Sequence, residues 1–214
     1  MKPLLIALVG VFLILLVSEL LWQKKVFKDE VARKFVHILV GSFVAFWPYF
    51  MSWRQIELMC LAFLLVVAAS MRFRVFHAVH GVTRDTRGEI FFPIGIGLTA
   101  LLAPSAVVFT AAILHLSLAD GLAALVGKKC GRRHTYTFRG YKKSLAGTLT
   151  FFLTSLLIIL AAVVGGGTAI TTATLPLLIL LPMAATVVEN TAVGGTDNVF
   201  VPLLVVSVLR LARL

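Results

Sequence analysis

Long apolar runs separated by short polar segments make up nearly the whole chain. A run of about 20 apolar residues is long enough to cross a bilayer as a helix. The third and fourth runs are short, and Pro104 stands either at a turn between the fourth and fifth or at a kink in one bent helix. We therefore predict eight spans, with seven as the alternative count, at residues 3–22, 35–53, 56–71, 90–102, 105–127, 144–164, 168–187 and 198–213.

The composition strengthens this interpretation. Hydrophobic residues make up 60% of the 214 residues, charged residues make up 14%, and the mean hydropathy is +1.02. These values exclude an ordinary soluble domain. We expect an all-α integral membrane protein, a multi-pass helical bundle that forms one polytopic domain over residues 1–214. The first apolar run has no basic region before it and no cleavage site, so residues 1–30 are expected to form a peripheral anchoring helix and its loop.

The basic residues divide between the two ends of the predicted bundle. Of the 20 lysines and arginines, 5 lie in 23–34, 4 in 72–90 and 7 in 128–143, which is 16 on one face against 4 on the other. Basic loops stay on the cytoplasmic side. The polar loops are therefore expected in the cytoplasm, at the cell membrane, with both termini outside. The net charge of +11 suits anionic lipid headgroups or phosphates.

Five ionisable residues fall at or within the cytoplasmic half of the predicted spans. A charge at a helix centre costs roughly 2.5 to 3.5 kcal/mol on insertion, so such residues usually face a bundle interior or a wet cavity and have a function. The alternative is a side chain at the interface that water reaches. The residues are His37, His115, Asp120, Glu189 and Asp197.

One helical face of small residues begins at the acid of the fifth run. Asp120, Ala124, Gly127 and Gly131 recur at helical spacing. Glycines four apart in lipid usually pack helices together, but the intervening Lys-Lys-Cys is too charged for a buried helix seam. We expect instead that the backbone approaches an anionic ligand there.

The basic loop ends at a predicted helix start, in the sequence YKKSLAGT. Ser144 is placed to cap the sixth helix, and Lys142 and Lys143 precede it. Free backbone N–H groups, a capping hydroxyl and lysines together favour an anion site. The spacing is not that of a Walker loop.

Two further segments carry charges at the same face. Arg33 and Lys34 precede the second run and His37 lies near its start, while Arg87 and Glu89 precede the fourth. We expect all five to contribute to the same site.

A third segment is acidic. Residues 188–202 hold Glu189, Asp197 and Asn198 without any basic residue. Oxygen ligands of this kind suit Mg²⁺, which typically uses one or two carboxylates together with substrate phosphates. The alternative is that Thr196 or Asp197 only caps the last helix.

These motifs together resemble the polyprenol kinase family, which includes dolichol kinase, phytol kinase and a CTP-dependent diacylglycerol kinase, and which is related to phosphatidate cytidylyltransferase. The resemblance covers about residues 31–203, the expected kinase-like core. It rests on the patterns Asp-x-x-Ala-x-x-x-Gly-x-x-x-Gly from Asp120, Lys-Lys-Ser-x-x-Gly-Thr from Lys142, and on Arg33-Lys34-x-x-His37, Arg87-Gly88-Glu89 and Thr196-Asp197-Asn198.

One position departs from the dolichol kinases, which carry a glutamate where this chain has Ala146. Members similar to phytol kinase are closer there. The resemblance therefore favours a shorter isoprenoid alcohol over dolichol.

The resemblance implies a CTP-dependent kinase that phosphorylates an isoprenoid alcohol at the membrane surface and releases CDP. The partners expected are the alcohol, a nucleoside triphosphate, Mg²⁺ and the bilayer, with no nucleic acid. The alternatives are a cytidylyltransferase that makes a CDP-lipid, and a transporter of anionic lipids without enzymatic activity.

The implied residues fall into three groups. Catalytic roles are assigned to Asp120, His37 and Glu89, with either Asp120 or His37 as the base. Mg²⁺ is assigned to Asp120, Asp197, Glu189 and Asn198. Nucleotide and phosphate binding is assigned to Ala123, Gly127, Lys128, Gly131, Lys142, Lys143, Ser144, Gly147, Thr148, Arg33, Lys34 and Arg87.

Overall fold

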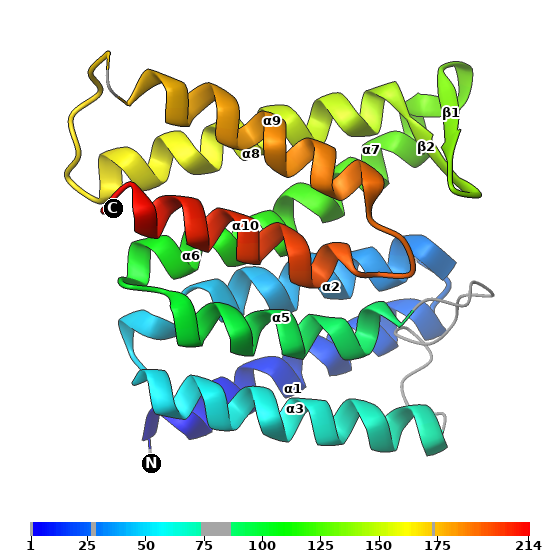
Figure 1. Cartoon of the computed structure of the whole chain (residues 1–214). Coiled ribbons are helices and arrows are strands. Elements are labelled where there is room, and N and C mark those ends of the chain that lie inside the picture. The colour runs from blue at the N-terminus through cyan, green and yellow to red at the C-terminus, as the bar shows by residue number, and fades with distance from the viewer. Residues whose placement is uncertain (1, 27–28, 74–86, 173) are drawn as a thin grey trace.

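The computed structural model describes residues 2–26, 29–73, 87–172 and 174–214. Its helices lie side by side with nearly parallel axes (Figure 1). They are α1 (Lys2–Gln23), α2 (Asp29–Ala45), the short η1 (Trp47–Tyr49), α3 (Trp53–Phe73), α5 (Gly88–Leu102), α6 (Ala106–Leu114), η2 (His115–Ala119), α7 (Asp120–Cys130), η3 (Gly131–Arg133), α8 (Leu145–Gly165), α9 (Leu175–Thr191) and α10 (Asp197–Leu211).

The prediction of a helical bundle is confirmed, and its helices are compatible with a membrane protein. Among the described residues, four stretches are long and apolar enough to cross a membrane: Lys2–Gln23, Glu30–Tyr49, Ala106–Cys130 and Leu145–Gly165. Gly88–Leu102 and Leu175–Thr191 are shorter apolar helices. At Pro104 the chain turns, because Ala103 and Ser105 are extended and the Ser105 hydroxyl caps α6 by accepting from Val108 N at 3.2 Å.

Two predicted helix starts were wrong by more than one helical turn. The second helix begins at Asp29, ahead of the apolar run, so Arg33, Lys34 and His37 all stand on α2. The seventh run was expected to begin at residue 168, but α9 begins at Leu175. The threonines before α9 form turns instead, because the hydroxyl of Thr174 bonds to carbonyls within the loop.

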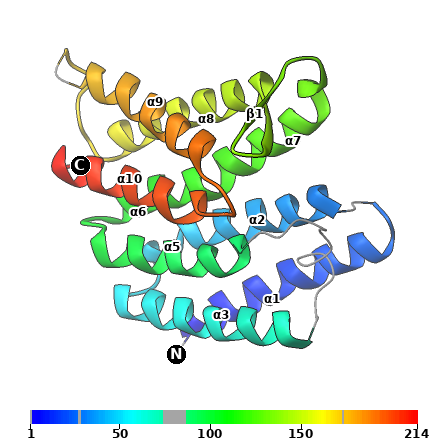
Figure 2. The same cartoon turned by 45° about the vertical axis from the view of Figure 1, so that its right-hand side comes forward.

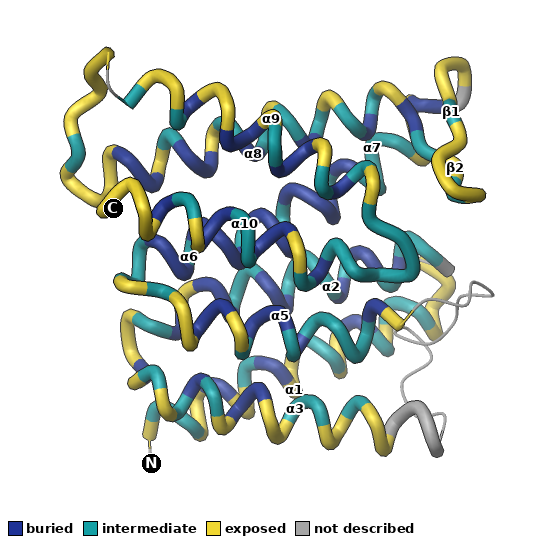
Figure 3. The backbone as a smooth tube through the Cα atoms, in the orientation of Figure 1, coloured by how far each residue is buried: buried dark blue, intermediate teal, exposed yellow. Residues whose placement is uncertain are grey.

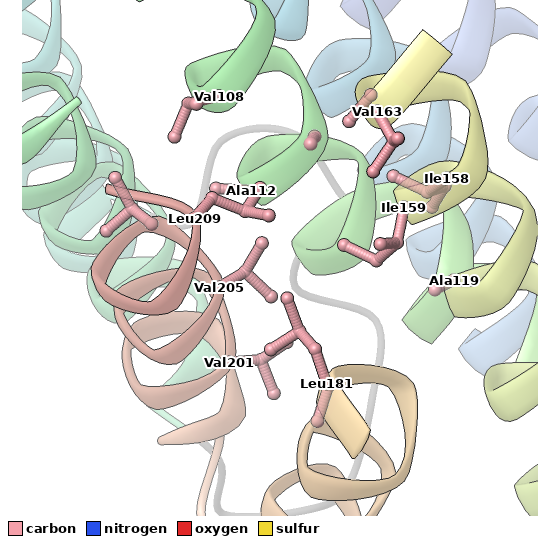
Figure 4. Packing of buried hydrophobic residues seen from close by; sticks show 14 of the residues in the cluster. Val108, Ala112, Ala119, Ile158, Ile159, Val163, Leu181, Val201, Val205 and Leu209 are labelled. Carbon is pink, nitrogen blue, oxygen red and sulfur yellow. The ribbon is translucent and has the colours of Figure 1, made fainter. Parts of the chain in front are cut away.

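Two hydrophobic clusters form the core, and α6 lies between them. Val108, Ala111 and Ala112 on one side of α6 pack against α8, α9 and α10 (Figure 4). Phe109 and Ile113 on its other side pack against α1, α2, α3 and α5. The continuous rod of α6, η2 and α7 therefore links both halves.

A π-helical turn, η2, interrupts this rod just before Asp120. The backbone N–H of Asp120 reaches His115 O. His115 itself is fully buried, with Nδ1 donating to Ala111 O at 2.7 Å and Nε2 accepting from Ser155 Oγ at 2.7 Å. Both ring nitrogens of His115 are thus hydrogen-bonded within the core, whereas Asp120 begins α7 and lines the cavity described below. Single π turns of this kind are frequent at functional sites.

The polar segments gather at one end of the bundle. Both termini and the α8–α9 loop lie at one end, and the β1/β2 hairpin lies at the other together with the α1–α2 and α9–α10 connections (Figures 1 and 2). The hairpin is largely exposed, while the middle helices are the most deeply buried (Figure 3). The basic segment expected at 72–90 falls mostly outside the described residues.

Residues 128–143 were expected to form a loop, but they contain the end of α7 and most of a β-hairpin. Strands β1 (Thr135–Phe138) and β2 (Tyr141–Ser144) pair antiparallel, with Thr135 opposite Ser144. Arg139 and Gly140 form the two-residue turn with φ of 47° and 83°. Turns with two positive φ values match the twist of a hairpin. The hairpin positions β2 directly before the first turn of α8.

Candidate active site

A cavity of about 1050 Å³ opens at the hairpin end of the bundle, among α2, α7, β2 and the adjoining ends of α8, α9 and α10. It brings together sixteen of the eighteen residues expected at the site. These are Arg33, Lys34, His37, Asp120, Ala123, Gly127, Lys128, Gly131, Lys142, Lys143, Ser144, Gly147, Thr148, Glu189, Asp197 and Asn198.

Asp120 is the centre of a buried ion-pair group. Its Oδ2 lies 2.5 Å from Lys34 Nζ and 3.2 Å from His37 Nε2. All three side chains are at most 13% exposed. A carboxylate can be buried like this only because the lysine compensates its charge.

His37 is held by its Nε2 atom, which also lies 2.7 Å from Leu116 O. A carbonyl only accepts, so Nε2 carries the proton and donates it to Leu116 O and Asp120. The ring packs on Phe92, with centroids 4.8 Å apart. Within the described part of the chain, no hydrogen bond is made to the other nitrogen, Nδ1. In the neutral ring this nitrogen is a proton acceptor beside the cavity.

Glu189 forms a second ion pair on the opposite wall. Lys143 Nζ lies 2.6 Å from Glu189 Oε1 and donates to Glu189 O at 2.7 Å. This contact ties β2 to the end of α9. The carboxylates of Asp120, Glu189 and Asp197 are close enough to repel one another, so the cavity collects negative charge opposite its lysines.

Asp197 and Asn198 begin α10. Thr196 occupies the N-cap position, yet its side chain makes no capping bond and instead bonds to Val193 O at 2.9 Å. The amide nitrogen of Asn198 donates to Gly88 O at 3.0 Å. This bond directs the amide nitrogen toward α5 and leaves the amide oxygen as the acceptor of this side chain.

The glycines of α7 pack closely against the start of α8, contrary to the expectation that lysines exclude a helix seam. A Cβ at Gly127 would lie 2.8 Å from Ser144 Oγ, and one at Gly131 would collide with the same side chain. A Cβ at Gly147 would lie 2.8 Å from Ala123 O. The lysines point outward from this seam, because Lys128 and Lys129 are exposed. Gly127 and Gly131 therefore pack closely against the start of α8 and also line the cavity.

Ser144 caps α8 as predicted, with its Oγ accepting from Gly147 N at 3.1 Å. Thr148 one turn later faces the same cavity. The first turn of α8 thus presents its N-terminal end to the cavity, where the helix dipole favours an anion.

One buried hydrogen-bond donor of Arg33 has no acceptor among the described residues. Its Nη2 atom pairs with Glu30 Oε1 at 2.5 Å, while Nε is buried and has no hydrogen-bond partner among the described residues. Buried polar atoms are nearly always hydrogen-bonded in complete structures. A ligand oxygen is the kind of group that satisfies this donor.

Two expected residues are not in the large cavity. Arg87 is exposed, and its backbone N–H donates to Gly194 O at 3.1 Å. Glu89 lines a smaller adjoining cavity instead. Both stand at the start of α5, one helix away from the large cavity.

Sequence reasoning missed several polar residues of the site. Tyr136 OH bonds to Thr148 Oγ1 at 2.6 Å and to Asn190 Oδ1 at 2.5 Å, which fastens β1 onto α8 and α9. Tyr141 and Thr135 also line or border the cavity. The signal that was available is the β-favouring run Thr-Tyr-Thr-Phe before Arg-Gly, which predicts a strand and a turn.

The charges of the cavity nearly balance. Its walls carry five basic and four acidic side chains: Arg33, Lys34, Lys128, Lys142 and Lys143, against Glu30, Asp120, Glu189 and Asp197. Among the described residues, no three His, Cys, Asp or Glu side chains group closely enough to hold a metal by themselves. A donor set of spaced carboxylates and an amide fits a cation that shares its coordination with substrate phosphates.

The chain is similar to curated phytol kinases. A phytol kinase of Synechocystis sp. is 33% identical over 202 residues, which cover 89% of this chain and 82% of that protein. Phytol kinase 1 of Arabidopsis thaliana, a chloroplastic protein, is 28% identical over an alignment of 217 positions, which covers 91% of this chain and 70% of that protein. A probable chloroplastic phytol kinase of Zea mays is 27% identical, and the alignment again covers 91% of this chain and 70% of that protein. No family model and no solved structure matches the chain significantly.

Proposed function

Because this chain belongs to the polyprenol kinase family, alongside the phytol kinases, we propose that it transfers the γ-phosphoryl group of CTP to the hydroxyl of a phytol-like isoprenoid alcohol. One observation carries the proposal: the Lys34–Asp120–His37 group and the lysine-bearing hairpin converge on a single cavity. Phosphoryl transfer requires mainly positioning and charge neutralisation. Both are supplied by this cavity.

Phosphate binding falls to the hairpin side of the cavity. Lys142 and Lys143 stand on β2, and the first turn of α8 follows directly. The N-terminal end of α8 favours an anion, and charge-assisted contacts from the lysines strengthen its binding. Arg33 Nε, which has no partner among the described residues, supplies a further donor.

Asp120, Glu189, Asp197 and the amide oxygen of Asn198 are the groups that would hold Mg²⁺. Mg²⁺ supplies charge neutralisation on the phosphates when bound. Lys34 and Lys143 compensate the negative charges of the buried Asp120 and Glu189 carboxylates. Both lysines also line the cavity, so they would place positive charge beside the phosphates of a bound nucleotide.

His37 is the base in this mechanism. Its Nδ1 accepts the hydroxyl proton while the alcohol oxygen forms a bond to the γ-phosphorus and the bond to the β-γ bridging oxygen breaks. The products are a lipid monophosphate and CDP. Asp120 holds the protonated nitrogen Nε2 and stabilises the imidazolium that forms. Leu116 O fixes the ring orientation.

We propose further that the bundle spans a cell membrane eight times as one domain, with residues 31–203 as the kinase core. The cavity end then faces the cytoplasm, where CTP and Mg²⁺ are available. The distribution of basic residues supports this orientation. Both termini lie at the opposite end, which fits an even number of spans (Figure 1).

The test uses the full chain purified in detergent, supplied with CTP, Mg²⁺ and one alcohol at a time from phytol, geranylgeraniol, dolichol and diacylglycerol. We expect CDP in equal amount to a lipid monophosphate, greatest with phytol or geranylgeraniol, and no product after chelation of Mg²⁺. Pyrophosphate as the product, or turnover that needs no alcohol, would refute the assignment.

A further inference from the structure

A second cavity, of about 120 Å³, adjoins the first one. It lies among α1, α2, α3 and α5, on the far side of His37 from Asp120's helix. Three residues line both cavities: Arg33, His37 and Asn198. The two spaces therefore meet at the side chain that serves as the base in the proposed function.

Away from that junction, and apart from Glu89 at the start of α5, the walls of this second cavity are mostly apolar. Val36 and Val40 of α2 and Val11 of α1 form the buried part, with exposures of 8%, 6% and 2%. Val66 and Val67 of α3 form the outer part, and Val66 is 53% exposed. In a protein that spans a membrane, such an exposed apolar side chain faces lipid. The cavity thus connects the lipid-facing surface to His37.

We infer that this cavity, which we call the α1–α3 groove, binds the hydroxyl-bearing end of the isoprenoid alcohol. The inference rests on the proposed function. The hydroxyl lies at the junction with Arg33, His37 and Asn198, and the hydrocarbon that follows it packs on the valines. Apolar walls that end at a base and at phosphate-binding groups match a molecule with one polar end and a hydrocarbon body.

The volume limits how much of the alcohol is held. A space of 120 Å³ has room for roughly four groups of about 30 Å³, the share of a water molecule in the liquid. This is close to a single isoprene unit and far less than a whole phytol chain. The remaining chain leaves past Val66 into the bilayer. The groove therefore recognises the first isoprene unit and distinguishes little among alcohols from geraniol to geranylgeraniol, which differ only beyond that unit.

The sharpest variant is Val67→Trp, which fills the half-buried wall of the groove. Its control is Leu65→Trp, at an adjacent lipid-facing position that does not line the groove and is 65% exposed. Each methylene group of the alcohol that is buried strengthens binding about fourfold. If the tryptophan displaces two or more methylene groups from the groove, the KM for phytol should rise at least about tenfold. The KM for CTP stays at the parent value in both variants, and Leu65→Trp leaves the KM for phytol unchanged.

Acceptor length gives an independent measurement on the parent protein. Geraniol, farnesol and geranylgeraniol share one isoprene end and differ only in length. At equal mole fraction in the micelle, their kcat/KM values are expected within roughly threefold of one another, because no further methylene enters the groove. A steep dependence on length would overturn the inference.

The remaining outcomes separate the two proposals. A parent protein that forms no lipid monophosphate refutes the proposed function itself. A parent that forms it, with Val67→Trp and Leu65→Trp showing the same KM for phytol, refutes only the groove. Should Val67→Trp fail to fold, Val66→Trp at the exposed rim replaces it, with the same expected direction and the same refuting result.

Discussion

Asp120 serves two buried partners with a single oxygen, since Lys34 Nζ and His37 Nε2 both approach Oδ2. We predict that Asp120→Asn lowers turnover by about 10²- to 10⁴-fold, the range typical of general acid–base groups. It should also lower the melting temperature, because Lys34 is then a buried charge without compensation. Such a change lowers the free energy of unfolding by about 3 to 5 kcal/mol. Phosphoryl transfer and thermal unfolding in detergent measure the two effects.

The double variant Lys34→Gln with Asp120→Asn is the control for that prediction. It removes both charges, so the melting temperature should rise most of the way back to that of the parent protein. Turnover should remain as low as in Asp120→Asn. Turnover of folded Asp120→Asn within a few-fold of the parent would remove Asp120 from the mechanism.

His37 offers a cleaner separation of binding from chemistry. Glutamine in its place keeps a donor for Leu116 O but supplies no basic ring nitrogen. We predict that His37→Gln lowers kcat about 100-fold or more and leaves the KM for CTP near that of the parent, because CTP binds on the hairpin side. Steady-state kinetics with CTP varied check both values, and an unchanged kcat contradicts the role as base.

At the residue scale, the sequence predicted much of the site because charged groups are rare in spans and therefore conspicuous. Asp120 and Glu189 both line the cavity as expected. The pairing of Asp120 with Lys34, 86 positions away, was not predictable, since it depends on how α2 packs against α7. Arg87 and Glu89 share that chemistry but begin a helix that leads away from the large cavity.

The β1/β2 hairpin is the element on which nucleotide binding depends most in this account. Tyr136 OH anchors it to Thr148 and Asn190. We predict that Tyr136→Phe raises the KM for CTP about three- to tenfold, because each lost hydrogen bond is worth about 0.5 to 1.5 kcal/mol. Titration of CTP in the kinase assay measures the change.

Thr137→Ala is the matched control, since Thr137 is exposed on the same strand. It should leave the KM for CTP unchanged. Equal KM values in Tyr136→Phe and Thr137→Ala would show that the anchoring of the hairpin has no part in nucleotide binding.

Elements with a strong periodic pattern were predicted well, and elements decided by local turns were not. The cap at Ser144 and the helix through Asp120 followed from spacing alone. The hairpin was missed because the seven basic residues of 128–143 indicated a polar loop. A helix seam at Gly127 and Gly131 was rejected on charge, although helix geometry lets exposed lysines alternate with closely packed glycines.

At the scale of the molecule, the arrangement separates two ends with different chemistry. We predict that the hairpin end is cytoplasmic. With exposed Cys130 changed to serine, Thr135→Cys should resist an impermeant thiol reagent in intact cells and react after permeabilisation. Ala169→Cys, exposed on the α8–α9 loop at the opposite end, should react in intact cells. The reverse pattern would invert the bundle and place the cavity outside.

The central claim is that the γ-phosphoryl group moves to the alcohol, and the position of the label in CTP tests it most directly. Purified protein receives phytol, Mg²⁺ and CTP labelled with radioactive phosphorus at either the γ or the α position, and the organic extract is counted. We expect label in the lipid from γ-labelled CTP and none from α-labelled CTP. Label in the lipid from α-labelled CTP would show instead that a cytidylyl group is transferred, and would refute phosphoryl transfer.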